Sequence, residues 1–348
     1  MRILVVGPAL KFPWVEYTAT AFRRLGHTTS VFWYSRIWAN RIFSPKVGDR
    51  LAGAPALLEW WNGRGRYWRQ ARDDSLVVHA RRVRPELTVV LKGELLTDDG
   101  VRALRQEVRG PVVTWWTDDP WRYPSSVERW RLYEHAFIFD RSYVRRLAST
   151  GLTQAHFLPC ACDESVYYPR RLSWPERMRY QCQIAFVGWY DPNRANVVRT
   201  LSGYTVGIWG QGWTSREARR ILNGRIPRLR LRGYVRDAQA AKIYSAATIG
   251  LNIHHGQSCE AGLNTRTFEL LAAGAFELVD AIPSMDELLT PGEEVVTYHS
   301  PDEARALVRY YLDRPAERTR IAERGRARVL REHTYLNRMQ TLLRTVRR

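Results

Sequence analysis

Residues 248–280 read TIGLNIHHGQSCEAGLNTRTFELLAAGAFELVD, and this stretch decides the fold around it. Thr248–Ile253 is a short apolar run typical of a strand, and a loop rich in Gly, His, Ser and Cys follows it. Asn264, or the threonine after it, is suited to cap a helix, and Gly274 is suited to end that helix. Ala275–Val279 has the composition of a second buried strand. The stretch therefore predicts a strand, a loop, a helix and a strand.

The start of this predicted helix carries a set of polar side chains. Asn264, Arg266 and Glu269 fall within about a turn and a half, at 3.6 residues per turn. A helix N-terminus offers free N–H groups and a positive dipole end, which suits a phosphate. The three residues can supply an amide, a cation and a carboxylate to the phosphates and ribose of a nucleotide. The same spacing also fits an ordinary βαβ unit with a capped helix, and spacing alone does not choose between the two.

The N-terminal half alternates strand and helix patterns. Arg2–Val6 is a predicted strand, Val15–Leu25 a predicted helix that Gly26 ends, and His27–Tyr34 the next strand. This order is the opening of a Rossmann-like domain. No G-x-G-x-x-G follows the first strand, so the sequence does not predict dinucleotide binding there.

A poorly periodic insertion follows at residues 35–65, with tryptophans among Gly, Pro and Arg. An insertion of this length is more often functional or mobile than not. It fits an acceptor-recognition loop and a membrane-facing loop equally well. Tyr67–Arg84 is then predicted to be helical, with Pro85 just beyond its end.

Polar residues follow two predicted strands of the first half. Leu87–Leu91 precedes Glu94, and Pro111–Trp116 precedes the adjacent Asp118 and Asp119. In doubly wound sheets ligands bind beyond the carboxyl ends of the strands, so these carboxylates are expected on one rim. Polar loop residues and helix caps are the alternative interpretation. The remaining strands predicted for this half are Ala136–Phe139 and His156–Leu158.

The second half repeats the alternation after a Pro- and Arg-containing connection at 160–180. Gly188 ends its first strand, where a backbone can approach a diphosphate, although a simple βα turn explains this glycine equally well. The predicted strands are Gln183–Val187, Tyr204–Trp209, Arg228–Leu231, Thr248–Ile253, Ala275–Val279 and Glu294–Tyr298. The predicted helices include Asp237–Ala246, Ser284–Leu289, Pro301–Leu312 and one or two Arg-rich helices over 315–348.

The segment NTRTFELLAAGAFELVD resembles the signature of the CgeB-like (spore-maturation-type) glycosyltransferases, which are nucleotide-sugar transferases of the GT-B fold. The likeness covers most of the chain and is densest from about residue 155. The segments that share it are WWTDDPW at 115–121, FLPCACDESVYYP at 157–169, FVGWYD at 186–191, IWGQGW at 208–213, RGYV at 232–235 and REHTYLNRM at 331–339.

The resemblance implies an α/β protein of the GT-B fold, with two Rossmann-like parallel-sheet domains facing across a cleft. The expected limits are an acceptor domain at 1–165, a nucleotide-sugar domain at 166–332, and a C-terminal helix at 333–348 that packs back toward the first domain. The implied donor-binding residues are Gly188, Trp209, Tyr234, Asn264, Arg266, Thr267 and Glu269.

The resemblance also implies roles for these donor-binding residues. Glu269 would bond the ribose hydroxyls, whereas Arg266, Asn264 and the helix N-terminus would neutralise the leaving diphosphate in place of a metal ion. Trp209 would flank the base with Tyr234 opposite, although a core position suits this tryptophan about as well. The donor is expected to be a UDP-sugar, with no bound cofactor and no metal.

One departure from the family pattern leaves the stereochemistry open. Many retaining GT-B enzymes carry two glutamates eight residues apart, and Glu269 matches the second of them. The first position is Ala261, with Glu260 one residue away, and Glu277 lies eight residues beyond in the next strand.

The catalytic prediction depends on that stereochemistry. An inverting enzyme needs a general base for the acceptor hydroxyl. The candidates are Asp119 or Asp118, with Glu94 in reserve. A retaining enzyme needs no such base, and the carboxylates would then position the acceptor.

Net charge is +19, almost all of it from arginine. Such a chain favours polyanions, namely nucleic acid, an anionic membrane surface or an acidic glycan. Glycan, lipid-linked, protein or small-molecule acceptors come first. DNA with a hydroxylated base comes second, because phage DNA glucosyltransferases share the GT-B architecture. A non-catalytic GT-B-like protein that binds a nucleotide, a glycan or nucleic acid is the rival class.

Composition places the chain among soluble globular proteins, with 45% apolar and 26% charged residues. No run approaches the roughly 18 apolar residues of a membrane span. The N-terminus enters a strand pattern without a signal peptide, so the expected location is cytoplasmic, with a peripheral membrane position as a variant. Cys160, Cys162, Cys182 and Cys259 form neither a disulfide framework nor a zinc motif and are expected to be reduced.

Overall fold

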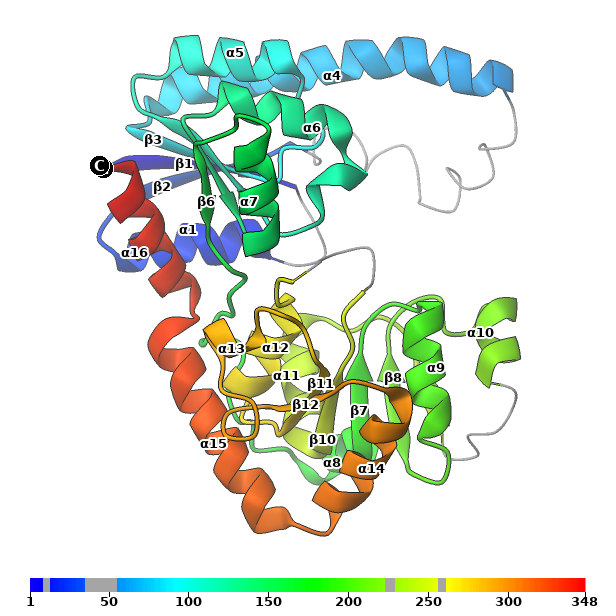
Figure 1. Cartoon of the computed structure of the whole chain (residues 1–348). Coiled ribbons are helices and arrows are strands. Elements are labelled where there is room, and N and C mark those ends of the chain that lie inside the picture. The colour runs from blue at the N-terminus through cyan, green and yellow to red at the C-terminus, as the bar shows by residue number, and fades with distance from the viewer. Residues whose placement is uncertain (9–12, 35–54, 223–228, 256–260, 348) are drawn as a thin grey trace. The chain divides into compact units, whose positions relative to one another are not determined.

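The computed structural model describes residues 1–8, 13–34, 55–222, 229–255 and 261–347. The chain divides into two compact units, and each is described by itself (Figure 1). Unit 1 comprises Met1–Ile138, Tyr143–Leu158 and Met339–Arg348, whereas unit 2 comprises Phe139–Ser142 and Pro159–Arg338. The sequence places the main limit a few residues later, at 165/166, and assigns 333–338 to the last segment.

Unit 1 contains one six-stranded parallel sheet with the strand order β2-β1-β3-β4-β5-β6. Its strands are β1 (Arg2–Gly7), β2 (Thr28–Trp33), β3 (Leu87–Leu91), β4 (Val112–Trp116), β5 (His135–Ile138) and β6 (Ala155–Phe157). Its helices are α1 (Trp14–Arg24), α4 (Pro55–Val83), α5 (Asp98–Glu107), the 3-10 turns η1 (Pro120–Arg122) and η2 (Trp130–Leu132), α6 (Pro124–Arg129), and α7 (Arg141–Ser149), which begins in unit 2.

The central strands of unit 1 are buried along their whole length. β3 reads LTVVL and β4 reads VVTWW, and every residue of both is buried. Such continuous apolar runs are typical of parallel strands that are covered on both faces. The polar segments that follow β3 and β4 are thereby placed at the carboxyl edge of the sheet, as the sequence predicts.

The helix before β3 is longer than predicted. α4 begins at Pro55, so the predicted irregular insertion is helical over its residues 55–65, and its residues 35–54 lie outside the described part of the chain. Gly63 and Gly65 explain the error, because glycine disfavours helix interiors by about 1 kcal/mol relative to alanine. α4 packs against α5 and also contacts β1 and β2.

Unit 2 contains a second six-stranded parallel sheet with the order β12-β11-β10-β7-β8-β9. Its strands are β7 (Cys182–Val187), β8 (Val206–Trp209), β9 (Leu229–Arg232), β10 (Ala247–Asn252), β11 (Glu277–Asp280) and β12 (Val296–Tyr298). Its helices are α8 (Trp174–Tyr180), α9 (Pro192–Thr200), α10 (Arg216–Leu222), α11 (Asp237–Ala246), α12 (Thr265–Ala272), α13 (Met285–Leu288), α14 (Pro301–Leu312), α15 (Pro315–Glu332), and α16 (Tyr335–Val346), which ends in unit 1.

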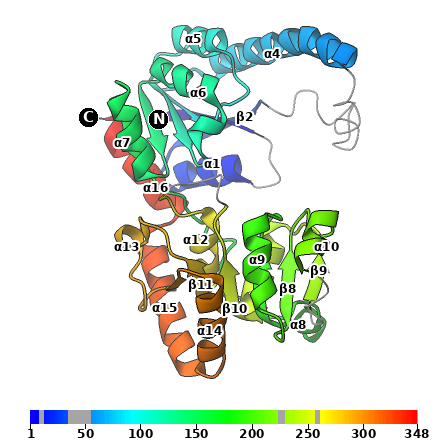
Figure 2. The same cartoon turned by 45° about the vertical axis from the view of Figure 1, so that its right-hand side comes forward.

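The strand order of unit 2 reverses direction between β7 and β10. The chain runs outward from β7 through β8 and β9, then returns to the other side of β7 with β10, β11 and β12. Ligands of doubly wound sheets bind at such a switch point, beyond the carboxyl ends of the strands. α12 packs against α15, whereas α14 packs against α9 (Figure 2). The N-terminus of α12 lies at the carboxyl edge, because this helix follows β10 in a parallel sheet.

The predicted fold class, two Rossmann-like parallel sheets, is confirmed. The strand limits differ by up to two residues. β11 begins two residues later than predicted, because the N–H of Ala275 still donates to the carbonyl of Leu270 at the end of α12 (3.1 Å). The described cysteines, Cys160, Cys162 and Cys182, are buried free thiols, and Cys259 lies outside the described residues.

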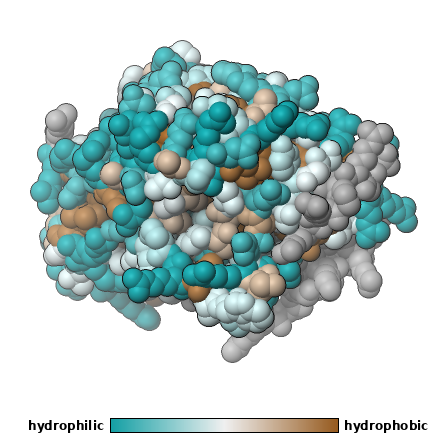
Figure 3. All heavy atoms as spheres, turned by 90° about the horizontal axis from the view of Figure 1, so that it is seen from below, coloured by the Kyte–Doolittle hydropathy of each residue, from teal (hydrophilic) through white to brown (hydrophobic). Residues whose placement is uncertain are grey.

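Hydrophilic residues predominate on the face shown in Figure 3, with hydrophobic ones scattered among them. Within the described ranges, no helix combines the length and the apolar composition that a membrane crossing requires.

Candidate functional site

The helix α12 begins as its sequence predicts. Asn264 is the N-cap residue, and its side-chain oxygen accepts a hydrogen bond from the N–H of Thr267 at 3.2 Å. This bond satisfies one of the free donors of the first turn. Gly274 follows the helix with a φ of +75°, a conformation that glycine adopts without strain.

Arg266 and Glu269 form an ion pair on one face of α12. The Nη1 atom of Arg266 lies 2.5 Å from the Oε2 atom of Glu269, as three-residue spacing on a helix allows. The same Nη1 atom donates to the hydroxyl of Tyr244 at 3.1 Å. The ring of Tyr244 in turn stacks on that of Tyr167, with centroids 6.5 Å apart. The buried side chain of Tyr244, with that of Tyr167 stacked on it, thus lies beside the ion pair.

Burial governs the electrostatics of the pair. It raises the pKa of the Glu269 carboxyl to about 7, against the opposing effects of the Arg266 charge and of the nearby Tyr167 hydroxyl. The pKa of Arg266 lies well above its usual range, because the attraction of Glu269 and of the Tyr244 hydroxyl exceeds the effect of burial. The site therefore holds a permanent cation beside a carboxyl that ionises near neutral pH.

Two residues that follow β9 lie within electrostatic reach of this pair. Burial raises the pKa of Tyr234, Asp237 raises it further, and Arg266 lowers it. Asp237, the first residue of α11, also raises the pKa of Glu269. The structure thus brings the predicted Tyr234 toward Arg266 and Glu269. The sequence analysis did not single out Asp237, although the sequence places this residue at the start of a helix that follows a strand.

The side chain of Thr267 is buried, and its predicted ligand contact stays a prediction. Its side chain is 0% exposed, and its hydroxyl accepts from the Nδ2 atom of Asn252 at 3.0 Å. Asn264 also faces Asn252, and their amides exchange two hydrogen bonds of 3.1 Å each. Thr267 therefore lies on the inner side of α12, whereas Arg266 and Glu269 lie on another face of the helix.

The predicted base contact of Trp209 also stays a prediction, and its side chain lies inside the unit. Its side chain is 2% exposed, and a Cβ atom on Gly207 would collide with its ring. A tryptophan in this position packs inside the unit and does not present a stacking surface to a ligand. The core alternative for Trp209 is therefore the one that the structure supports.

Gly188 ends β7 next to Gly210, which follows β8. A Cβ atom on Gly210 would overlap the carbonyl of Gly188, so the two strand ends approach closely only because the second residue is glycine. The Gly188 carbonyl also accepts from the indole Nε1 of Trp213 at 2.9 Å. This arrangement gives Gly188 a structural reason for its place, and its contact with a diphosphate stays a prediction.

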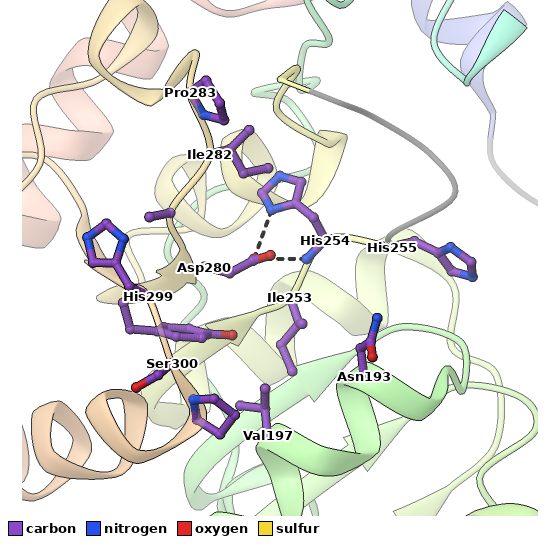
Figure 4. A pocket seen from close by; sticks show the side chains of 13 residues that line it. Asn193, Val197, Ile253, His254, His255, Asp280, Ile282, Pro283, His299 and Ser300 are labelled. Carbon is purple, nitrogen blue, oxygen red and sulfur yellow. Dashed lines mark hydrogen bonds and ion pairs between the residues drawn. The ribbon is translucent and has the colours of Figure 1, made fainter.

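A histidine that the sequence did not single out organises the loop after β10. His254 lies 2.9 Å through its Nδ1 atom from the Oδ1 atom of Asp280 (Figure 4). Its Nε2 atom lies 3.1 Å from the backbone nitrogen of Asn264. The backbone N–H at Asn264 must donate, so the ring carries its proton on Nδ1. His254 therefore joins the end of β11 to the N-cap of α12.

A cavity of about 410 Å³ opens beside this histidine, at the carboxyl ends of β10, β11 and β12. Figure 4 shows its lining, which combines imidazole, carboxylate and amide groups with apolar side chains. The residues that line it are Asn193, Val197, Ile253, His254, His255, Asp280, Ala281, Ile282, Pro283, Tyr298, His299, Ser300 and Pro301. Glu260, which lies one residue from the position of the first family glutamate, is outside the described residues.

The predicted catalytic carboxylates lie in unit 1, at the ends of β3 and β4. The Oδ2 atom of Asp118 lies 3.4 Å from the Nζ atom of Lys92, and Asp119 caps η1 by accepting from the N–H of Trp121 at 2.8 Å. Their side chains therefore diverge, as expected for neighbours at a strand end. Glu94 accepts a hydrogen bond from the hydroxyl of Tyr34 at 2.7 Å.

Lys92 is the basic centre of this group. Its φ is +65°, the left-handed conformation that is uncommon for a side-chain-bearing residue. The ammonium lies 4.4 Å from the ring centroid of Tyr123 and 3.1 Å from its hydroxyl. Burial lowers the pKa of Lys92, but Tyr123, Glu94 and Asp118 together raise it above its usual value.

Within the described ranges, no three His, Cys, Asp or Glu side chains are grouped to hold a metal ion. The carboxylates of unit 1 and the Arg266–Glu269 pair of unit 2 are each built locally, and their roles stay predictions.

The first comparisons are with solved structures, and they concern the fold. The fold matches sucrose-phosphate synthase from Thermosynechococcus elongatus (TM-score 0.71, 14% identity, 99% of each chain). It also matches HepE from Anabaena in a structure that contains UDP and glucose (TM-score 0.67, 12% identity, 99% of each chain). Both likenesses concern the fold, and with the two parallel sheets they confirm the GT-B architecture.

The sequence comparisons point to glycosyltransferases. A family model described as glycosyl transferase-like matches residues 194–344. The spore protein CgeB of Bacillus subtilis is 22% identical over 251 residues, which are 68% of this chain and 75% of that protein. The predicted resemblance to CgeB-like glycosyltransferases is confirmed, and so is the enzyme class, a glycosyltransferase.

Proposed function

We propose that this enzyme transfers a sugar from a nucleotide-sugar, a UDP-sugar first, to an acceptor hydroxyl. The observation that carries the proposal is the Arg266–Glu269 pair at the start of α12, at the carboxyl edge of the second sheet. An arginine beside a helix N-terminus suits a diphosphate, and a carboxylate suits the two hydroxyls of a ribose. The HepE structure with UDP and glucose supports uridine as the base to test first.

In this proposal Arg266 and the N-terminal N–H groups of α12 stabilise the charge that develops on the leaving diphosphate. Fixed donors in a partly buried site lower the barrier most when they face the developing charge. The side chains of Arg266 and Glu269 are 18% and 10% exposed, so water screens the pair only weakly. We expect that this arrangement takes the place of a metal ion, and that activity persists in EDTA.

Glu269 has a distinct part in donor binding. Only its ionised form can accept hydrogen bonds from both ribose hydroxyls. Arg266 holds it in place at 2.5 Å and favours its ionised form. Tyr234 and Asp237 lie within electrostatic reach of the pair and are proposed to border the nucleoside.

The acceptor side is assigned to the carboxylates that follow β4. We assign Asp119 as the general base for an inverting transfer, because Asp118 is already paired with Lys92. The acceptor is a glycan, a lipid-linked sugar, a protein or a small molecule. The net charge of +19 favours an acidic acceptor or one at an anionic surface.

DNA that carries a hydroxylated base is the second candidate acceptor, and the same net charge favours it. Contacts to phosphates release counterions, so affinity for a duplex would fall steeply with salt. Binding to a duplex that survives 0.2 M salt, together with transfer to hydroxylated bases, would place DNA first.

The experiment that tests the proposed function is release of nucleoside diphosphate from a panel of UDP-, GDP-, TDP- and ADP-sugars, with and without EDTA. We expect release with a UDP-sugar, unchanged by EDTA and abolished in Glu269→Ala. The matched control is Glu293→Ala, because Glu293 forms an exposed ion pair with Arg324 in the same unit (3.2 Å). Tight nucleotide binding without release for any donor or acceptor would favour a non-catalytic binding protein.

A further inference from the structure

A buried carboxyl group lies behind the first turn of α12. Glu277, the first residue of β11, is 0% exposed. Its Oε1 atom accepts a hydrogen bond of 2.9 Å from the Nδ2 atom of Asn252, the last residue of β10. Glu277 lies eight residues after Glu269, but it is in the next strand, so this spacing is a coincidence. The donor site described above does not use Glu277.

Asn252 connects Glu277 to α12. Its Nδ2 atom also lies 3.1 Å from the Oδ1 atom of Asn264 and 3.0 Å from the Oγ1 atom of Thr267. Its own Oδ1 atom accepts from the Nδ2 atom of Asn264 at 3.1 Å. One amide therefore joins two neighbouring strands to the N-cap and to the third residue of the helix.

The number of hydrogens on the Asn252 amide limits the hydrogen bonds that it can donate. A side-chain amide nitrogen carries two hydrogens, yet three oxygens lie within 3.1 Å of the Nδ2 atom of Asn252. Two hydrogens cannot point fully at three oxygens, so at least one of these contacts is shared unless the hydroxyl of Thr267 or a protonated Glu277 donates to a neighbouring oxygen. A protonated carboxyl fits, because an ionised one buried without a countercharge is costly.

The charges around Glu277 agree with a proton on its carboxyl. The pKa of Glu277 is raised to about 8, chiefly by burial and further by the charge of Asp280 on the same strand, against the opposing effect of its polar neighbours Asn252 and Thr267. His254, which follows β10, is held by Asp280 at 2.9 Å. Among the described residues, no cation is paired with Glu277 to offset this burial.

We propose that Glu277 is a positioning residue which, as an uncharged acid, holds Asn252 and through it the first turn of α12 in place for the donor. This inference rests on the proposed function, because Arg266 and Glu269 are the groups that the turn presents. Loss of the proton would place a second negative charge beside Asp280. The ionised carboxyl would also attract the Nδ2 hydrogens of Asn252 more strongly, at the expense of the contacts of that amide with Asn264 and Thr267, so the donor site would loosen.

We therefore expect the affinity for the donor to depend on pH in two limbs, one on the acid side and one on the alkaline side. Affinity rises as Glu269 ionises, and it falls as Glu277 loses its proton. If the ionised form of Glu277 does not bind donor, the Kd for UDP rises about tenfold per pH unit beyond that ionisation. Glutamine cannot ionise but keeps the shape and one polar oxygen, so Glu277→Gln should lose only the alkaline limb.

The test is calorimetric titration of UDP between pH 6 and 9.5 on the full chain, Glu277→Gln and the control Glu294→Gln. Glu294 is a suitable control, because its side chain accepts from the exposed N–H of Thr290 in the same unit. We expect Glu277→Gln to match wild type at pH 7.5 and to keep its affinity at pH 9, where wild type and control weaken about tenfold or more.

Three results would overturn the inference. Glu277→Gln could lose affinity at pH 7.5, it could weaken at pH 9 as much as wild type, or wild type could bind equally at both pH values. Absence of UDP binding by wild type throughout the pH range would instead remove the proposed function, and this inference with it. Unfolding curves of each variant at pH 7.5 show whether a loss of affinity is merely a loss of fold.

Discussion

Arg266 and Glu269 lie three residues apart on α12 and meet at 2.5 Å, beside the hydroxyl of Tyr244, whose ring stacks on that of Tyr167. A charge-assisted pair with so little exposure is held in one geometry and is screened only weakly by solvent. In an apo protein each charge already compensates the other. A nucleoside diphosphate can therefore use the free donors of the guanidinium and the free oxygen of the carboxylate without creating a lone buried charge.

Glu269→Gln should weaken UDP binding by roughly ten- to a hundredfold, because hydrogen bonds to charged groups contribute about 1.5–3 kcal/mol. The cost should nearly vanish with 2′,3′-dideoxy-UDP, since that ligand lacks the hydroxyls assigned to Glu269. Calorimetry of the two ligands on wild type and variant closes a double-mutant cycle. An equal loss for both ligands would show that Glu269 does not bind the ribose.

Tyr244→Phe removes the hydroxyl that accepts from Arg266 at 3.1 Å and leaves the ring stack with Tyr167 in place. We expect a loss of about 0.5–1.5 kcal/mol in stability, the usual range for one hydrogen bond. The Kd for UDP should rise a few-fold, because the guanidinium is less well fixed. Denaturant unfolding and calorimetry measure the two effects, and an unchanged Kd would separate Tyr244 from the donor site.

Asp119→Asn tests the assigned general base. Asparagine caps a helical turn as well as aspartate does, so the contact to the N–H of Trp121 at 2.8 Å should survive. We expect kcat for transfer to fall about 10²- to 10⁴-fold with an unchanged donor KM. The control is Asp99→Asn, which alters an exposed i,i+3 ion pair of the same unit. A normal kcat in Asp119→Asn would favour a retaining enzyme without a base.

His333 should make unit 2 sensitive to acid. Burial and, after it, the nearby Arg338 charge lower the pKa of its imidazole to about 3. The ring accepts from Arg338 at 2.8 Å and lies 2.9 Å from the carbonyl of Leu288. The unfolded chain takes up this proton near pH 6.5, whereas the folded one does not until about pH 3.

The stabilisation from His333 is therefore complete above pH 6.5 and is lost as the pH falls toward 3. Wild type should lose about 1.4 kcal/mol per pH unit over this range relative to His333→Gln. Urea unfolding at pH 7.5 and pH 5 measures the difference. Parallel losses in the two proteins would contradict the assignment to His333.

The α/β order and the strands of both sheets were predictable, because buried parallel strands are unbroken apolar runs between turn residues. The helix start at Asn264 was predictable for a similar reason, since capping is decided by local chemistry. The long-range pairs were not. The contacts of Asn252 with Glu277 and of His254 with Asp280 join residues more than twenty positions apart, and only the β10–β11 pairing brings them together.

Two residues predicted to contact the ligand are buried, and the sequence did not show this, because periodicity does not reveal which face of an element is inner. Thr267 lies three residues after Asn264 and one after Arg266, so either face of α12 was open to it. Trp209 ends a strand and appeared free to face a base, but its ring folds back over Gly207. The start of α4 was missed because its first turns contain two glycines.

The most direct test of the account is a thermal-shift panel with UDP, GDP, CDP, TDP and ADP on wild type, Arg266→Ala and Arg324→Ala. Arg324 forms an exposed pair with Glu293 in the same unit and serves as the matched control. A ligand at about a hundred times its Kd stabilises the folded state by about 2.7 kcal/mol. We expect UDP to raise the Tm of wild type and of Arg324→Ala, and we expect no such rise for Arg266→Ala. Equal shifts in all three proteins, or none with any nucleotide, would contradict a donor site at the start of α12.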